Sequence, residues 1–178
     1  ARLVRDSAWR DQGAGVLPDL GSHLLDTLRF WMGDDFNPEF RITGAYRHEN
    51  RSFDQVIVTA DGAVAIQLEM TMLSWRNHHV TEVLAEKGSA HIESLCKWGP
   101  STFTHRTRIL PSGRPPEEAV TLVQSDPTWE LEYDHFVTLC RDKPGSHNLD
   151  NDLWLNRTLR ELAAQAGVTE LTRDSADA

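Results

Sequence analysis

Residues 53–72 read FDQVIVTADGAVAIQLEMTM and carry the clearest strand pattern in the chain. Two β-rich runs flank Asp61-Gly62, and the second run alternates apolar and polar residues from Val64 to Met72. Alternation with a period of two indicates a strand with one buried face. Asp-Gly between two such runs favours a type I′ turn, because glycine tolerates a positive φ. The stretch therefore predicts an antiparallel hairpin.

The chain on both sides of this hairpin extends the sheet. Further strands are expected over residues 39–48, 80–86, 89–95 and 102–110, with a turn at Lys87-Gly88 and a surface loop over 111–118. About six strands in a meander predict a large, mostly antiparallel, open-faced sheet.

Helical patterns lie before and after these strands. Helices are expected over residues 18–32, from Asp126-Pro127 onward, and over about 150–166 with a stop at Gly167. Cys140 falls on an apolar stripe of the second helix and is expected to be buried. The predicted fold class is α+β, with the helices packed on one face of the sheet.

Composition bounds the function. The chain has 178 residues, 39% apolar and 25% charged, and a net charge of −9, which is typical of one globular domain. No positive field is available to attract nucleic acid, and no apolar run approaches the length of a membrane span. Two cysteines make no disulfide framework, so a cytoplasmic protein is expected. The sequence begins at Ala1 in what reads like the middle of a protein, and we expect a fragment.

Residues 13–26 read GAGVLPDLGSHLLD and hold the best candidate site. Asp19 and His23 are four residues apart on a predicted helix, so a carboxylate and an imidazole could jointly hold a substrate hydroxyl. Imidazole titrates near neutrality, which suits proton transfer to or from an alcohol. With 100° per residue, Asp26 shares an arc of roughly 60° with them. The alternative is that Asp19 only caps the helix and His23 is an ordinary residue.

Three further residues are candidates for substrate binding. Ser22 and the preceding Gly15 would open the entry for a ligand. Trp75 follows the long strand, where an aromatic ring could stack on a sugar, although rim packing is the alternative. No motif supports a metal site, and a metal-dependent hydrolase with a site built from the eight histidines is the weakest alternative.

The run G-x-G-x-L-x-D-x-G-x-H-x-x-D, preceded by Trp9-Arg10, resembles the start of the C-terminal substrate domain of the Gfo/Idh/MocA family of oxidoreductases. The Asp61-Gly62 hairpin, the 83–90 stretch and the two final helices follow the family's order. Ala14 stands where the family often has glycine. The resemblance covers residues 9–167, leaves 168–178 as a tail, and implies that 1–178 is a single substrate-binding and oligomerisation domain.

The resemblance also implies a function. Family members are NAD(P)-dependent dehydrogenases that move a hydride from or to a sugar, cyclitol or related polyol. His23 would be the acid/base residue, Asp19 would hold the substrate and tune the proton transfer, and Asp26 would be structural. A homo-oligomer through the open sheet face is expected. The alternative is a non-catalytic regulatory or oligomerisation module that binds a dinucleotide or a sugar.

The cofactor would be NAD or NADP, bound mainly by an N-terminal Rossmann domain that is absent from this sequence. Gly13-Ala14-Gly15 is no substitute, because no βαβ unit or ribose-binding acid surrounds it. No cofactor-binding residue is therefore assigned here. We expect the fragment alone to be inactive, because the cofactor carries the hydride.

Overall fold

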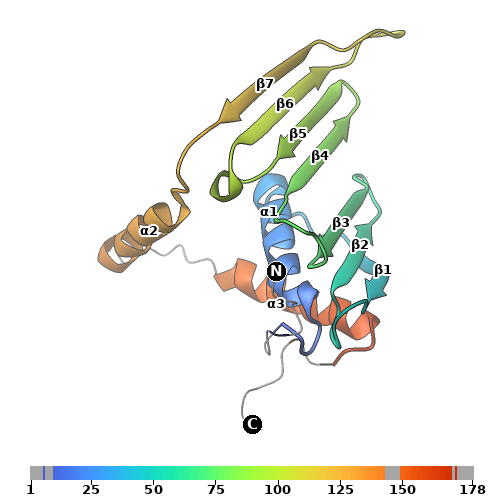
Figure 1. Ribbon diagram of the computed structural model, residues 1–178, viewed down its shortest axis with the longest axis vertical. Helices are drawn as coiled ribbons and strands as arrows, with labels where there is room; N and C mark the ends of the chain where they lie inside the picture. The colour runs from blue at the N-terminus through green and yellow to red at the C-terminus, as the bar shows by residue number, and fades with distance from the viewer. Residues whose placement is uncertain (1–5, 7–9, 143–148, 170, 172–178) are drawn as a thin grey trace. The chain divides into compact units, whose positions relative to one another are not determined.

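The computed structural model describes residue 6 and residues 10–142, 149–169 and 171 (Figure 1). The chain forms two compact units, Ala1–Leu73 with Ser146–Ala178, and Ser74–Gly145. Trp9 and most of the expected 168–178 tail lie outside the described residues. The assignment of one functional domain to residues 1–178 stays a prediction.

The first unit contains an antiparallel sheet of three strands. These are β1 (Phe40–Tyr46), β2 (Gln55–Ala60) and β3 (Ile66–Thr71), in the order β1-β2-β3. Strand β2 pairs with β3 from Gln55 opposite Thr71 to Ala60 opposite Ile66, which confirms the hairpin. The predicted two-residue turn is wrong, because residues 61–65 form the connection and Val64 lies in it rather than in the strand.

The longer connection has a clear cause in the pairing of side chains. In the observed register Val56 lies opposite Met70 and Val58 opposite Leu68. A two-residue turn at Asp61-Gly62 would shift the pairing so that Val56 lay opposite Gln67. Burial of one face fixes the register of a strand, so the apolar matches outweigh the turn preference of Asp-Gly.

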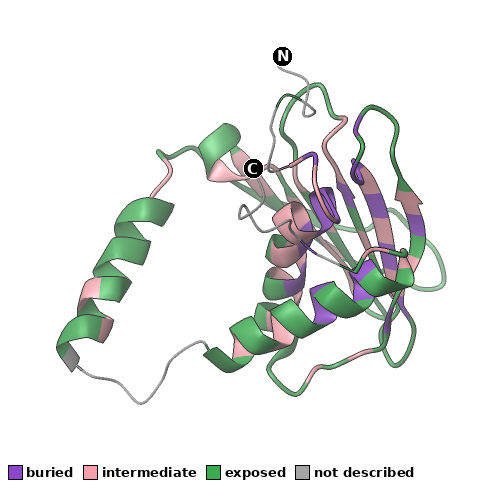
Figure 2. Ribbon diagram, turned by 90° about the horizontal axis from the view of Figure 1, so that it is seen from below, coloured by how far each residue is buried: buried purple, intermediate pink, exposed green. Residues whose placement is uncertain are grey.

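Helices cover one face of this sheet and form the core with it. They are the π-helical turn η2 (Leu17–Gly21), α1 (Ser22–Met32) and α3 (Leu149–Gln165). Figure 2 shows buried positions on the strands and on the side of α3 that faces them. The core includes the following side chains: Leu17, Leu25, Phe40, Phe53, Val56, Val58, Met70, Leu159 and Leu162. The predicted helices over 18–32 and 150–166 are confirmed, except that the first begins with a π turn.

The C-terminal end of α3 is tied to the edge strand β1. The Gln165 side chain accepts a hydrogen bond from the Ile42 backbone N–H (2.9 Å) and donates one to the Phe40 carbonyl (3.1 Å). Helix α3 ends just before Gly167, which has a φ of 75°. A glycine with a positive φ is common directly after the C-terminal end of a helix. These contacts satisfy backbone groups of an otherwise unpaired sheet edge.

A buried carboxylate organises the loop between β1 and β2. Asp54 is fully buried and accepts backbone N–H bonds from His48 (2.8 and 3.0 Å), Glu49 (2.6 Å) and Asn50 (3.2 Å). A carboxylate with several backbone donors is well satisfied away from water. The loop that carries Arg51 and Ser52 is thereby held in one conformation.

The second unit contains an antiparallel sheet of four strands. These are β4 (Val80–Ala85), β5 (Gly88–Glu93), β6 (Ser101–Thr107) and β7 (Glu117–Leu122), in the order β4-β5-β6-β7. The turn between β4 and β5 is Glu86-Lys87 rather than Lys87-Gly88, because Gly88 pairs with Ala85. Strand β7 was not predicted and begins within the expected 111–118 loop.

The two faces of this second sheet differ in polarity. The register aligns Ile92, Phe103 and Val120 across neighbouring strands on one face. The other face carries the ion pair between Arg106 Nε and Glu117 Oε2 (2.6 Å). Phe103 and Val120 are exposed, so this unit presents an uncovered apolar sheet face.

Helix α2 (Thr128–Asp142) also belongs to the second unit. The Asp126 carboxylate accepts a hydrogen bond from the Thr128 backbone N–H (3.1 Å), which satisfies a donor at the start of the helix as the Asp-Pro motif predicted. The expected burial of Cys140 is wrong, because this residue is exposed. The apolar stripe of α2 is largely uncovered, with Trp129 at 78% exposed, and Cys140 shares that exposure.

The predicted α+β class with antiparallel strands is confirmed. Seven strands are present in the described residues, hydrogen-bonded as sheets of three and four strands rather than as one continuous sheet. Residues 72–79, between β3 and β4, contain no strand.

Candidate functional site

The glycine segment at the start of the predicted site is tightly built into the first unit. Gly13 and Gly15 have positive φ values of 53° and 59°. Gly15 is buried, and a Cβ there would overlap the Phe53 carbonyl oxygen and lie 2.7 Å from the Phe53 nitrogen. Glycine is therefore required at position 15 because this residue packs closely against the backbone of Phe53, just before β2. This requirement is independent of any role of Gly15 in substrate binding.

Backbone hydrogen bonds occupy the N–H groups of this segment. The Ala14 N–H donates to the Leu171 carbonyl (3.1 Å), the Gly15 N–H to the Gln12 carbonyl (3.0 Å), and the Val16 N–H to the Phe53 carbonyl (2.8 Å). A dinucleotide phosphate needs such donors free at a helix N-terminus. The described glycine segment therefore does not fit a pyrophosphate.

Asp19 lies in the π-helical turn and is held by an arginine. Its Oδ2 accepts a hydrogen bond from Arg10 Nε (3.1 Å), and its backbone carbonyl accepts one from Ser22 Oγ (2.9 Å). No side-chain capping bond starts either η2 or α1. Asp19 is thus not a helix cap. Its carboxylate binds the Arg10 side chain beside the start of the helix.

His23 follows one turn later, in the first turn of α1, and is exposed. Within the described residues the imidazole makes no hydrogen bond, and its backbone carbonyl accepts the Thr27 hydroxyl (2.8 Å). Asp26 lies further along the helix and accepts a hydrogen bond from Asn151 Nδ2 of α3 (2.6 Å). This contact between helices supports a structural role for Asp26.

Asp19 and His23 make no direct hydrogen bond with each other within the described residues, and their joint role toward a substrate stays a prediction. The sequence pattern assumed 100° per residue, whereas a π turn closes its hydrogen bonds over five residues and advances less per residue. Asp19 bonds to Arg10, and the His23 imidazole remains available. Single π turns are frequent at functional sites, and no sequence signal indicated this one.

The remaining candidate, Trp75, belongs to the second unit and is fully exposed. It lies in the irregular connection after β3. In the first unit, the structure joins Ser22 to Asp19 through a hydrogen bond. The role of Trp75 in substrate binding stays a prediction.

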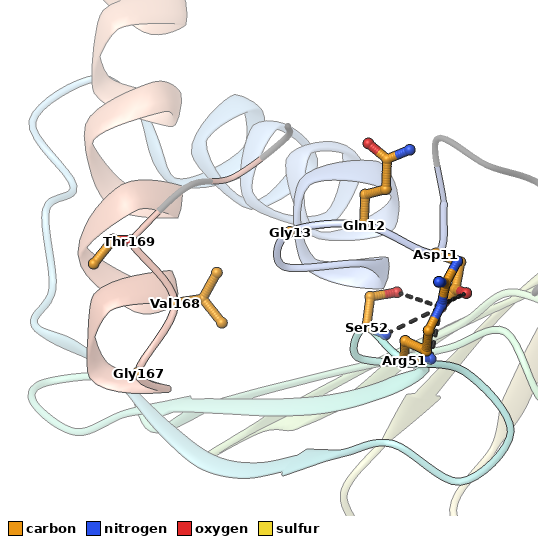
Figure 3. Close-up of a pocket in the computed structure, with 8 residues that line it drawn as sticks. All are labelled: Asp11, Gln12, Gly13, Arg51, Ser52, Gly167, Val168 and Thr169. Atoms are coloured by element: carbon orange, nitrogen blue, oxygen red, sulfur yellow. Dashed lines mark hydrogen bonds and ion pairs between the residues drawn. The ribbon is translucent and has the colours of Figure 1, made fainter. Parts of the chain in front are cut away.

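Sequence reasoning missed a pocket of about 490 Å³ in the first unit. Figure 3 shows Asp11, Arg51 and Ser52 together on one side of it and Val168 on the other. Arg51 Nε donates to Asp11 Oδ2 (2.8 Å), and Asp11 Oδ1 accepts the backbone N–H of Arg51 (2.6 Å) and of Ser52 (3.1 Å). Forty residues separate Asp11 from Arg51, so no local spacing could have indicated the pair.

The surroundings of Asp11 shift its ionisation. Burial raises the pKa of this carboxyl, but the hydrogen bonds from the Arg51 side chain and from the Ser52 and Arg51 backbone, with the Arg51 charge, outweigh it. The net pKa is lowered from its ordinary value of 3.8. The Asp11 carboxylate is therefore ionised at neutral pH and holds Arg51.

We expect the Asp11→Asn substitution to lower the free energy of unfolding at pH 7 by about 2 kcal/mol. Because the folded-state pKa is lowered, the stabilisation by Asp11 is complete above the ordinary carboxyl pKa and is lost as the pH falls below it. Denaturant unfolding from pH 7 to pH 3 should show the difference between wild type and variant closing below about pH 4. Asp61→Asn in an exposed loop is the control, and a difference that stayed constant with pH would contradict the assignment.

The described residues contain no group of three or more His, Cys, Asp or Glu side chains positioned to share a metal ion. Within the same part of the chain, every helix is too short or too polar to cross a lipid bilayer.

Residues 2–91 match the family described as the GFO/IDH/MocA C-terminal domain. The match includes the 13–26 segment, β1 to β4 and most of β5. No curated protein and no solved structure matches the chain.

Proposed function

The chain belongs to the GFO/IDH/MocA C-terminal domain family, and from this membership we propose that it is the substrate-binding part of an NAD(P)-dependent oxidoreductase. The substrate is a sugar, cyclitol or related polyol, and the reaction moves a hydride between its carbinol carbon and the cofactor. The observation that carries the proposal is the family match across the segment with Asp19 and His23. The cytoplasm remains the expected compartment.

His23 acts as the general base in this proposal. Oxidation of an alcohol needs a group that takes the hydroxyl proton, and imidazole is the side chain best suited to this near neutral pH. The exposure of His23 and the lack of a hydrogen bond to its ring within the described residues support this role. A ring already bonded inside the protein would be less available to a substrate hydroxyl.

Asp19 positions the substrate in this proposal. Its carboxylate already accepts one hydrogen bond from Arg10, and a carboxylate has further acceptor sites for a substrate hydroxyl. Asp19 thereby provides an acceptor one helical turn before the base.

The cofactor is bound mainly outside the described residues in this proposal. The hydrogen-bonded N–H groups of residues 14–16 do not fit a phosphate, and the sheets are antiparallel throughout the described pairings, unlike a dinucleotide-binding βαβ unit. When bound, the cofactor supplies the hydride acceptor or donor. The 178-residue chain contributes substrate binding and proton transfer.

The Asp19→Asn substitution in the complete protein tests this function. We expect kcat/KM for polyol oxidation to fall about tenfold or more, because a hydrogen bond to a charged group is lost. Asp26→Asn is the matched control, since Asp26 lies in α1, directly after the η2 turn that carries Asp19, and bonds to Asn151. This variant should leave kcat/KM close to the wild-type value. Equal loss in both variants, or loss in neither, would overturn the role of Asp19 and favour a non-catalytic binding module.

Assembly is part of the same proposal. The apolar face of the four-stranded sheet, with exposed Val83, Phe103, Val120 and Leu122, supports a homo-oligomer through the open sheet face. Apolar surface of this kind on a sheet is usually covered by another layer.

A further inference from the structure

The pocket beside Asp11 and Arg51 has no part in the proposed hydride transfer, because neither Asp19 nor His23 lines it. Its volume of about 490 Å³ is in the range of small-molecule sites. Gly13 and Gly167 line it and contribute no side chain to its wall. Their positive φ values of 53° and 75° disfavour any other residue at these two positions.

The polar side of the pocket includes the Arg51 guanidinium. The Asp11 side chain is 2% exposed and its two oxygens are occupied by Arg51 and Ser52 donors. The Arg51 side chain is 84% exposed, and only its Nε is hydrogen-bonded within the described residues. Asp11 therefore holds the guanidinium in place while the two terminal nitrogens remain available.

We propose that this pocket binds a small molecule through an oxyanion group, a carboxylate or a phosphate. The planar fork of a guanidinium matches two oxygens of either group with parallel N–H bonds. Val168 lies across the pocket from Arg51 (Figure 3) and contacts a short apolar part of the ligand. The net charge of −9 attracts no anion at long range, so affinity rests on this local contact.

Inorganic phosphate and propionate are the probes, titrated into ¹⁵N-labelled complete protein with sodium chloride at equal ionic strength as the reference. We expect saturable shifts of the Gly13 and Gly167 amide signals and of the Arg51 Nε–H signal. A response to phosphate alone identifies a phosphate ligand, and a response to propionate alone identifies a carboxylate. Either response supports the site.

Two variants of Arg51 and one matched control separate binding from folding. Arg51→Gln removes the charge and should abolish the response. Arg51→Lys keeps a charge beside Asp11 but loses the fork, and should weaken binding about tenfold. Arg41→Gln removes another exposed arginine of the same unit, paired with Glu39 at 3.8 Å, and should bind as wild type.

The proposal fails under either of two results. One is a wild-type shift no larger than that given by sodium chloride. The other is a saturable response that Arg51→Gln retains at full strength, with thermal unfolding confirming that the variant is folded. Polyol oxidation is measured in parallel in the same variants. Its loss or retention tests the hydride-transfer function, and the titration tests oxyanion binding by the pocket independently of that activity.

Discussion

Replacing His23 with alanine in the complete protein is expected to lower kcat for polyol oxidation by a factor of about 10² to 10⁴, the usual contribution of a positioned general base. The free energy of unfolding should change by no more than about 0.5 kcal/mol, because His23 is exposed and its ring makes no hydrogen bond within the described residues. Steady-state kinetics over pH and denaturant unfolding measure the two effects.

His135→Ala is the matched control for this experiment. His135 is also an exposed histidine on a helix, α2, and its removal should leave kcat unchanged. The pH profile of kcat/KM should lose the inflection due to the catalytic base in His23→Ala and should keep that inflection in His135→Ala. A folded His23→Ala variant with wild-type turnover would rule out His23 as the base.

Gly15→Ala should destabilise the fold by about 3 to 5 kcal/mol, enough to unfold much of a marginally stable protein. Two costs add at this position. A φ of 59° is unfavourable for a residue with a Cβ, and that Cβ would overlap the Phe53 carbonyl oxygen, where the backbone cannot move aside cheaply. Denaturant unfolding, or the soluble yield where the variant does not fold, measures the loss.

Two other glycines separate these costs. Gly33 has a φ of 89° with no atom near the position of an added Cβ, so Gly33→Ala should lose about 1 to 3 kcal/mol from backbone strain alone. Gly62 has open space and no positive φ, so Gly62→Ala should change stability by about 0.5 kcal/mol at most. If Gly15→Ala cost no more than Gly33→Ala, the packing against Phe53 would not be the reason for glycine.

Features that depend on neighbouring residues were predicted well. The hairpin around residues 61–65, the helices α1 and α3, and the stop at Gly167 follow from periodicity and from local glycine and proline preferences. Strand β7 was missed because it follows a proline-rich segment and all its residues are exposed. Its pairing with β6, and not its own pattern, makes it a strand.

The candidate site was predicted only in part. The 13–26 segment identified the family, and the family match covers it. Asp19 lies in the π turn at Leu17–Gly21. A helical wheel with 100° per residue does not describe the direction of a side chain in such a turn, because its hydrogen bonds span five residues. Arg10 became the partner of Asp19, and His23 was left exposed at the start of α1.

The α+β class, the antiparallel hairpin and the family follow from the amino-acid sequence, because each depends on the order and spacing of residues close together in the chain. The hairpin register, the pairing of Asp11 with Arg51 and the hydrogen bond between Asp26 and Asn151 become visible only in the folded structure. The last two contacts join residues 40 and 125 positions apart. They form because burying one common apolar face brings distant segments together, and no local preference encodes which polar groups then meet.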